Sequence, residues 1–105
     1  MKNNIQISLE LLNKIKKLIK KLHFSELNIK VFIFGSRVQG NPQERSDIDI
    51  GLEEINCKKI PATIKFDFQD ELEKIPTLLS FDIVDFSTVS KKFKTEAMKN
   101  IYYLN

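Results

Sequence analysis

Apolar residues recur every three or four positions along residues 8–22, and this spacing predicts an amphipathic helix. Ser8 stands where an N-cap is expected, and lysines gather toward the other end, where a helix favours positive charge. Residues 61–76 repeat the helical spacing between two prolines, which predicts a second helix. A similar pattern favours a last helix over roughly residues 88–103.

Three shorter runs favour strands. Residues 29–34 are apolar on nearly every position, as is typical of a central strand. Residues 47–52 alternate, so that the side chains of Ile48, Ile50 and Leu52 share one face and Asp47, Asp49 and Gly51 the other. Residues 80–86 form the third run. The order α-β-β-α-β-α predicts an α+β fold, in which a small mixed sheet of about three strands is backed by helices.

Composition narrows the class of protein. With 105 residues, 42% apolar and 30% charged, we expect one soluble globular domain over residues 1–105. The net charge is +3, and all but two of the 17 basic residues are lysines spread along the chain. A nucleic-acid surface would favour clustered arginines and aromatic residues, so no direct nucleic-acid partner is expected.

The cellular compartment of the protein is indicated by three features that the sequence lacks: a disulfide pair, a membrane span and a signal peptide. Cys57 is the only cysteine, so an intrachain disulfide is excluded and a reducing compartment is favoured. The apolar runs are shorter than a membrane span, and the first residues lack the apolar region of a signal peptide. We therefore expect a cytoplasmic protein without membrane contact.

A small-residue turn follows the first strand, at Gly35-Ser36. Glycine permits close backbone approach, and free amides after such a turn bind anions. The Ser36 hydroxyl can donate to a phosphate oxygen, and Arg37 either adds a positive charge or points to solvent. Taken alone, a Gly-Ser pair after a strand is an ordinary turn.

Paired carboxylates begin the second strand. Asp47 and Asp49 lie on one face, with Cα atoms roughly 6.5–7 Å apart. Such acids repel each other unless a cation lies between them, and Mg²⁺ prefers oxygen ligands of this kind. Asp82 is favoured as a third carboxylate because it interrupts an apolar strand, while Asp85 would face the opposite side. The alternatives are Asp85 as the third acid, Asp82 as a solvated acid on an edge strand, and a purely structural Ca²⁺ or Mg²⁺ site.

The motifs together resemble a known signature. Gly35-Ser36, ten residues and then Asp47-x-Asp49 resemble the signature of the polymerase-beta-like nucleotidyltransferases. The run FGSRVQGNPQERSDIDIGL is similar to their smallest members, which are encoded beside HEPN-domain ribonucleases. The resemblance implies a nucleotidyltransferase fold, with Gly35 and Ser36 at the nucleotide triphosphate, Asp47 and Asp49 as metal ligands, and Asp82 as metal ligand and base. Arg37, Gly40 and Ser46 also match frequent family residues, whereas Gln39 departs from a common arginine.

The same resemblance implies a function. Small members of this kind are antitoxins of type VII-like pairs, which use Mg²⁺, with two ions expected, to transfer AMP from ATP to a tyrosine of the HEPN ribonuclease. The chain lacks a helical domain to hold a small acceptor, so the acceptor is expected on the partner protein. The alternatives are an antitoxin that acts by stoichiometric binding alone and a nucleotidyltransferase with another hydroxyl acceptor.

Overall fold

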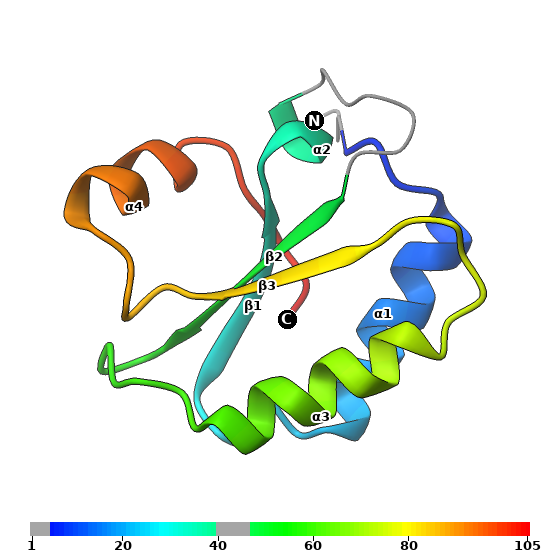
Figure 1. The fold of residues 1–105 in the computed structure, drawn as a ribbon, viewed down its shortest axis with the longest axis horizontal. Helices are drawn as coiled ribbons and strands as arrows, with labels where there is room; N and C mark the ends of the chain where they lie inside the picture. The colour runs from blue at the N-terminus through cyan, green and yellow to red at the C-terminus, as the bar shows by residue number, and fades with distance from the viewer. Residues whose placement is uncertain (1–4, 40–46) are drawn as a thin grey trace.

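The computed structural model describes residues 5–39 and 47–105 and contains four helices and four strands within them. The elements alternate along the chain, so that each strand is followed or preceded by a helix (Figure 1). In chain order they are α1 (Leu9–Lys21), β1 (Ile29–Phe34), α2 (Ser36–Gln39), β2 (Ile48–Glu54), α3 (Ala62–Glu73), β3 (Phe81–Asp85), α4 (Lys91–Ala97) and β4 (Tyr102–Tyr103).

The strands form one mixed sheet in the order β3-β2-β1-β4. β1 is antiparallel to both β2 and β4, whereas β2 and β3 are parallel. The parallel pair needs a crossover connection, and α3 supplies it on the face of the sheet that α1 also covers (Figure 1). The predicted α+β fold with a small mixed sheet is therefore confirmed.

The face covered by α1 and α3 holds the main core. Ile48, Ile50 and Leu52 point into it and are fully buried, as the alternation in β2 predicted. Ser8 caps α1, its hydroxyl accepting from the Leu11 amide at 3.2 Å. The predicted helices at 8–22 and 61–76 and the strands at 29–34 and 80–86 are all present, with bounds that shift by a few residues at most.

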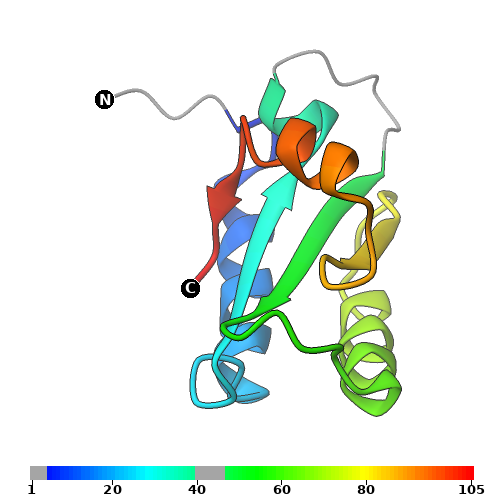
Figure 2. The same ribbon diagram turned by 90° about the vertical axis from the view of Figure 1, so that its left-hand side faces the viewer.

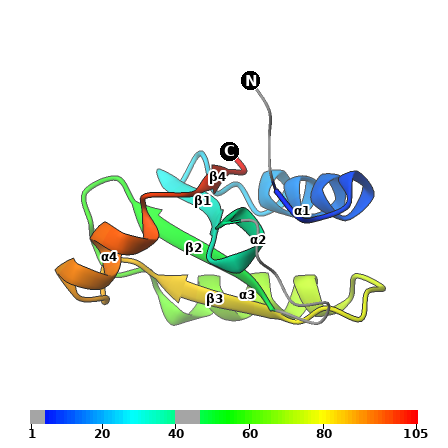
Figure 3. The ribbon, with the colours of Figure 1, turned by 90° about the horizontal axis from the view of Figure 1, so that it is seen from above.

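The opposite face carries a smaller aromatic cluster of Phe32, Phe34 and Phe86, and the Phe93 ring of α4 packs against Phe34 and Phe86. Figure 2 shows α4 over this face of the sheet. Gly51 lies under this cluster, and a Cβ there would be 2.8 Å from the Phe86 ring. Seen from above, α4 lies on one side of the sheet, and α1 lies on the other (Figure 3). α4 is only seven residues long and has no buried residue, so this face is covered far less than the other.

The last predicted helix, over roughly 88–103, is present but shorter than predicted. The helix is α4 and ends at Ala97, and the chain then returns to the sheet as β4, a fourth strand that the sequence did not predict. Tyr102 and Tyr103 pair with Ile33 and Phe32 of β1. An apolar run of this length fits a helix or a strand equally well, and the unpaired edge of β1 decides in favour of the strand.

The C-terminal apolar residues divide between core and surface. Leu104 is buried, while Tyr103 is exposed. Beyond β4, the Asn105 side chain extends the pairing: its Oδ1 accepts from the Val31 amide at 2.8 Å and its Nδ2 donates to the Ile29 carbonyl at 2.9 Å.

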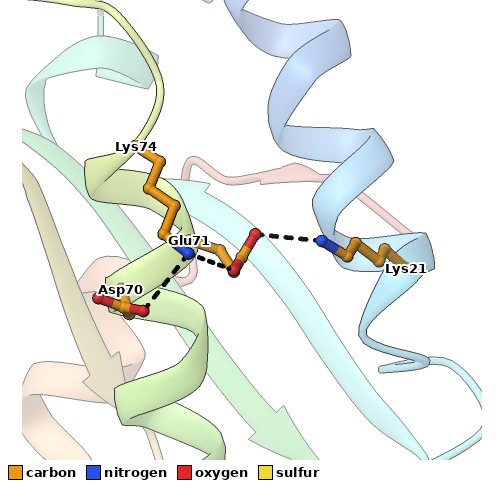
Figure 4. A network of polar contacts seen from close by, with 4 residues as sticks. All are labelled: Lys21, Asp70, Glu71 and Lys74. Carbon is orange, nitrogen blue, oxygen red and sulfur yellow. Dashed lines mark hydrogen bonds and ion pairs between the residues drawn. The ribbon is translucent and has the colours of Figure 1, made fainter.

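A polar network joins α1 to α3 at the edge of the main core (Figure 4). Lys21 of α1 donates to one oxygen of the Glu71 carboxylate at 3.3 Å, and Lys74 donates to the other at 3.0 Å. Asp70 lies 3.7 Å from the Lys74 ammonium. Within residues 5–39 and 47–105, no helix is long and apolar enough to cross a membrane.

Candidate active site

Gly35 ends β1 and turns the chain into α2. Its φ of +83° lies in the left-handed region, which a side chain disfavours. A Cβ at this position would also collide with the Asp49 carboxylate. The collision follows from the register of the sheet, because Phe34, one residue earlier, pairs with Asp49. Only glycine therefore permits this backbone turn with the Asp49 carboxylate packed directly against it.

Asp49 and Asp82 are direct neighbours across the parallel pair of β2 and β3. Ile48 and Phe81, which precede them, both point into the main core, so the two carboxylates leave the sheet on the opposite, more open face. Burial raises the pKa of Asp49, and the negative charges of Asp82 and then Asp47 raise it further. The structure thus brings together the three acids that the sequence singled out.

Asp47 is exposed and lies one residue before β2, so it joins the group from the loop side of the strand rather than from within it. The loop that precedes it, including Gly40 and Ser46, is outside the described residues. The side chains of Ser36 and Gln39 are outside the described part as well, although their backbone forms α2. The predicted contact of the Ser36 hydroxyl with a phosphate therefore stays a prediction.

Asp85 lies apart from this group. It falls on the same side of β3 as Phe81, facing α3, and is buried. Its carboxylate accepts from the Ile60 amide at 2.8 Å and from the Ser87 amide at 2.9 Å. The two bonds hold the segment before α3 and the segment after β3 in place. Of the two acids in β3, Asp82 is the one on the face of Asp49, and Asp85 serves the fold.

Arg37 is also engaged away from the carboxylates. Its side chain is buried, and Nη1 donates to the Gln6 carbonyl at 2.9 Å. The Gln6 amide in turn donates to the Arg37 carbonyl at 2.8 Å. This residue fastens the segment before α1 to α2. Its predicted contact with the nucleotide remains a prediction, and that contact would compete with the bond to Gln6.

The donor set fits a hard divalent cation. Besides burial, the negative charges of Asp82 and Asp47 raise the pKa of Asp49. A divalent cation bound by the oxygens of these carboxylates would offset that repulsion. In the described part of the chain, no three acidic, histidine or cysteine side chains already form a ligand cage. Asp47, Asp49 and Asp82 are therefore near one another without forming a closed ligand set in the described residues.

A cavity of about 280 Å³ lies beyond Asp82, between β3 and α3. The sequence did not predict the residues that line this cavity, although the position of one of them, Phe66, was an indication. The apolar spacing of the 61–76 helix follows Ile64, Phe68, Leu72 and Ile75, and Phe66 lies off that stripe. In the structure Phe66 is 73% exposed at the rim of the cavity.

Residues 6–104 match the family described as Polymerase beta, Nucleotidyltransferase, and the chain belongs to this family. The family match spans the whole of the described fold, and membership makes the chain a nucleotidyltransferase. The resemblance that the Gly-Ser and Asp-x-Asp motifs indicated is thereby confirmed. No protein of curated function matches the chain.

Solved structures of toxin–antitoxin pairs share the fold. One, a toxin–antitoxin with AMP-PNP, is 22% identical with a TM-score of 0.67, covering 90% of this chain and 72% of that one. A second, from Shewanella oneidensis, is an MNT antitoxin with a tri-AMPylated HEPN toxin, at 17% identity, a TM-score of 0.58 and coverages of 90% and 71%. A third, a mutant of the MntA–HpeT pair, is 18% identical with a TM-score of 0.62 and coverages of 86% and 72%.

Proposed function

We propose that this chain transfers AMP from ATP to a tyrosine hydroxyl of a HEPN-domain partner and thereby acts as the antitoxin of a type VII-like pair. The observation that carries the proposal is the placement of Asp49 beside Asp82, with Asp47 near and the Gly35 turn against the Asp49 carboxylate. Family membership supplies the reaction class, nucleotidyl transfer.

Asp47, Asp49 and Asp82 are the residues that would hold Mg²⁺, with two ions expected. When bound, the metal supplies neutralisation of the phosphate charge and orientation of the reacting oxygens. Gly35, whose missing side chain leaves its backbone directly against the Asp49 carboxylate, is the residue that we assign to the triphosphate. Ser36, at the start of α2, is the residue that we assign to a phosphate oxygen.

Asp82 is the base in this proposal. Its carboxylate accepts the proton of the acceptor hydroxyl, whose oxygen forms a bond to the α-phosphorus of ATP. The bond from the α-phosphorus to the bridging oxygen breaks, and pyrophosphate leaves with that oxygen. Asp82 is exposed on an edge strand, so an acceptor from solvent can reach it. A base in this position contributes typically 10²–10⁴-fold to the rate.

Two findings support a protein as acceptor. Among the described residues, the face that carries the carboxylates is covered by the short helix α4 alone, so this part of the chain offers little surface to hold a small acceptor. The similar solved structures are complexes of an antitoxin with its toxin, and one of those toxins is AMPylated. Because ATP is the proposed donor and a reducing compartment suits the lone Cys57, we place the reaction in the cytoplasm.

The test is transfer of label from α-³²P-ATP to the purified HEPN partner in the presence of Mg²⁺. We expect the Asp47→Asn chain to lose transfer at least 100-fold while its thermal unfolding stays close to that of the original chain, because Asp47 is exposed. Asp67→Asn, which changes an exposed acid on α3, is the matched control and should transfer normally.

Full transfer by Asp47→Asn would contradict the proposed site. Toxin neutralisation without any label on the partner, retained by Asp47→Asn, would instead favour inhibition by stoichiometric binding. Label on a different acceptor would keep the reaction and change the substrate.

A further inference from the structure

The cavity beyond β3 shares a residue with the candidate active site. It lies between the outer edge of β3 and the first turns of α3, with a volume of about 280 Å³. Its lining residues are Ala62, Lys65, Phe66, Gln69, Asp82 and Ile83. Any group that fills this space therefore lies against the strand that carries the proposed base.

The site and the cavity follow one another across the sheet. Gly35 ends β1, Asp49 is on β2, Asp82 is on β3, and the cavity lies beyond β3. The proposed nucleotide position at Gly35 is thus on one side of the carboxylates and the cavity on the other. In-line attack needs the acceptor oxygen and the leaving pyrophosphate on opposite sides of the α-phosphorus, and an acceptor on the far side of the carboxylates from the nucleotide is compatible with that requirement.

The size and lining of the cavity suit a single aromatic side chain. A space of about 280 Å³ lies at the lower end of the roughly 300–1,000 Å³ of ligand pockets, and it is large enough for an aromatic side chain. Phe66, Ala62 and Ile83 offer apolar surface, and Phe66 is 73% exposed without a partner to cover it in the described part of the chain. Aromatic rings pack favourably against one another and leave a hydroxyl free at one end.

The edge of β3 offers main-chain groups to the same occupant. The Ile48 amide donates to the Ser80 carbonyl and the Phe86 amide to the Leu52 carbonyl, so the even-numbered residues of this strand bond toward β2. With a period of two, the backbone of Ile83 points outward, and no strand of the described residues pairs with this edge. An extended segment, not a helix, matches such an edge.

We propose that the cavity between α3 and β3 is the acceptor site, and that it receives the tyrosine ring of an extended segment of the partner protein beside Asp82. The inference rests on the proposed function, since it assigns the acceptor of that reaction to a place. Phe66 is a positioning residue here: it contacts the ring, while Asp82 receives the proton.

Two variants test the site in opposite ways. Phe66→Glu places a charge in the cavity, and Ala62→Trp fills it. Both residues are exposed, so the fold should be kept. We expect AMP transfer at low partner concentration to fall at least tenfold with each, through a higher KM for the partner, while calorimetry gives an ATP affinity within twofold of the original. Leu78→Glu, at an apolar residue 86% exposed and outside the cavity lining, is the control and should leave both unchanged.

Normal transfer by both variants would overturn the proposal, and so would a loss of ATP affinity equal to the loss of transfer, which would make the cavity part of the nucleotide site. If the original chain transfers no AMP, the proposed function fails, but calorimetric titration with the partner still decides the place of contact. Unchanged partner affinity in Phe66→Glu and Ala62→Trp would then overturn the acceptor site.

Discussion

The two acids of β3, three residues apart, leave the strand on opposite faces. Asp82 leaves β3 on the open face beside Asp49, and Asp85 leaves it toward α3 and accepts from the Ile60 and Ser87 amides. Because both residues are aspartates, the face of the sheet to which each side chain points accounts for their different surroundings. In the proposed mechanism, β3 therefore carries the base on one face and structural hydrogen bonds on the other.

This division predicts that the two acids separate activity from stability. Asp82→Asn should lower AMP transfer by roughly 10²–10⁴-fold, as expected for a lost base, with a free energy of unfolding within about 0.5 kcal/mol of the original. Asp85→Ala leaves two amides without their acceptor and should cost roughly 1–3 kcal/mol, with the activity of the folded fraction retained. Urea unfolding and labelled transfer measure the two effects. An Asp85→Ala chain that is stable but inactive would exchange the two roles.

At the scale of elements, the sequence predicts what local pattern controls. The helical spacing of residues 8–22 and the strict alternation around Ile48 and Ile50 each admit one structure, and both are present. The C-terminal segment differs, because its apolar residues suit a helix or a strand. Its conformation is decided by the open edge of β1, which is some seventy residues away in the chain. No local pattern contains that information.

Asn105 shows how the edge of β1 is completed. Its carboxamide accepts from the Val31 amide and donates to the Ile29 carbonyl and to the Ser25 hydroxyl, so a side chain replaces the next backbone pair of β4. We expect Asn105→Ala to destabilise the chain by about 1–3 kcal/mol, since buried β1 loses these partners. Asn56→Ala, at an exposed asparagine whose side chain has no such role, is the control. Equal urea midpoints for the two variants would contradict the assignment.

At the scale of the whole molecule, the sheet places distant residues in one row. The sequence predicts Asp47 and Asp49 as one group, because they are two residues apart in a strand. It singles out Asp82 because an acid interrupts an apolar run, but the distance between Asp82 and Asp49 depends on the parallel pairing that α3 makes possible. The cavity beside Asp82 depends on the same packing of α3 against β3, so only Phe66, off the apolar stripe of its helix, indicates it in advance.

The packing of α1 beside α3 makes the stability of the whole molecule depend on pH. Hydrogen bonds from Lys74 and then Lys21 lower the pKa of Glu71 below its ordinary value of 4.5. The folded state therefore favours the ionised carboxylate, and the stabilisation is fully present above pH 4.5 and is lost as the pH falls through the lowered value.

We expect Glu71→Gln to lower the Tm slightly at pH 7 in low salt, because the network is solvent-exposed, and to have no effect once the pH is below both values. Asp67→Asn on the same helix is the control, and thermal unfolding at pH 7 and pH 2.5 is the measurement. A deficit of Glu71→Gln that is as large at pH 2.5 or in 0.5 M salt as at pH 7 in low salt would assign its effect to packing, since a charge contribution shrinks on protonation and on screening.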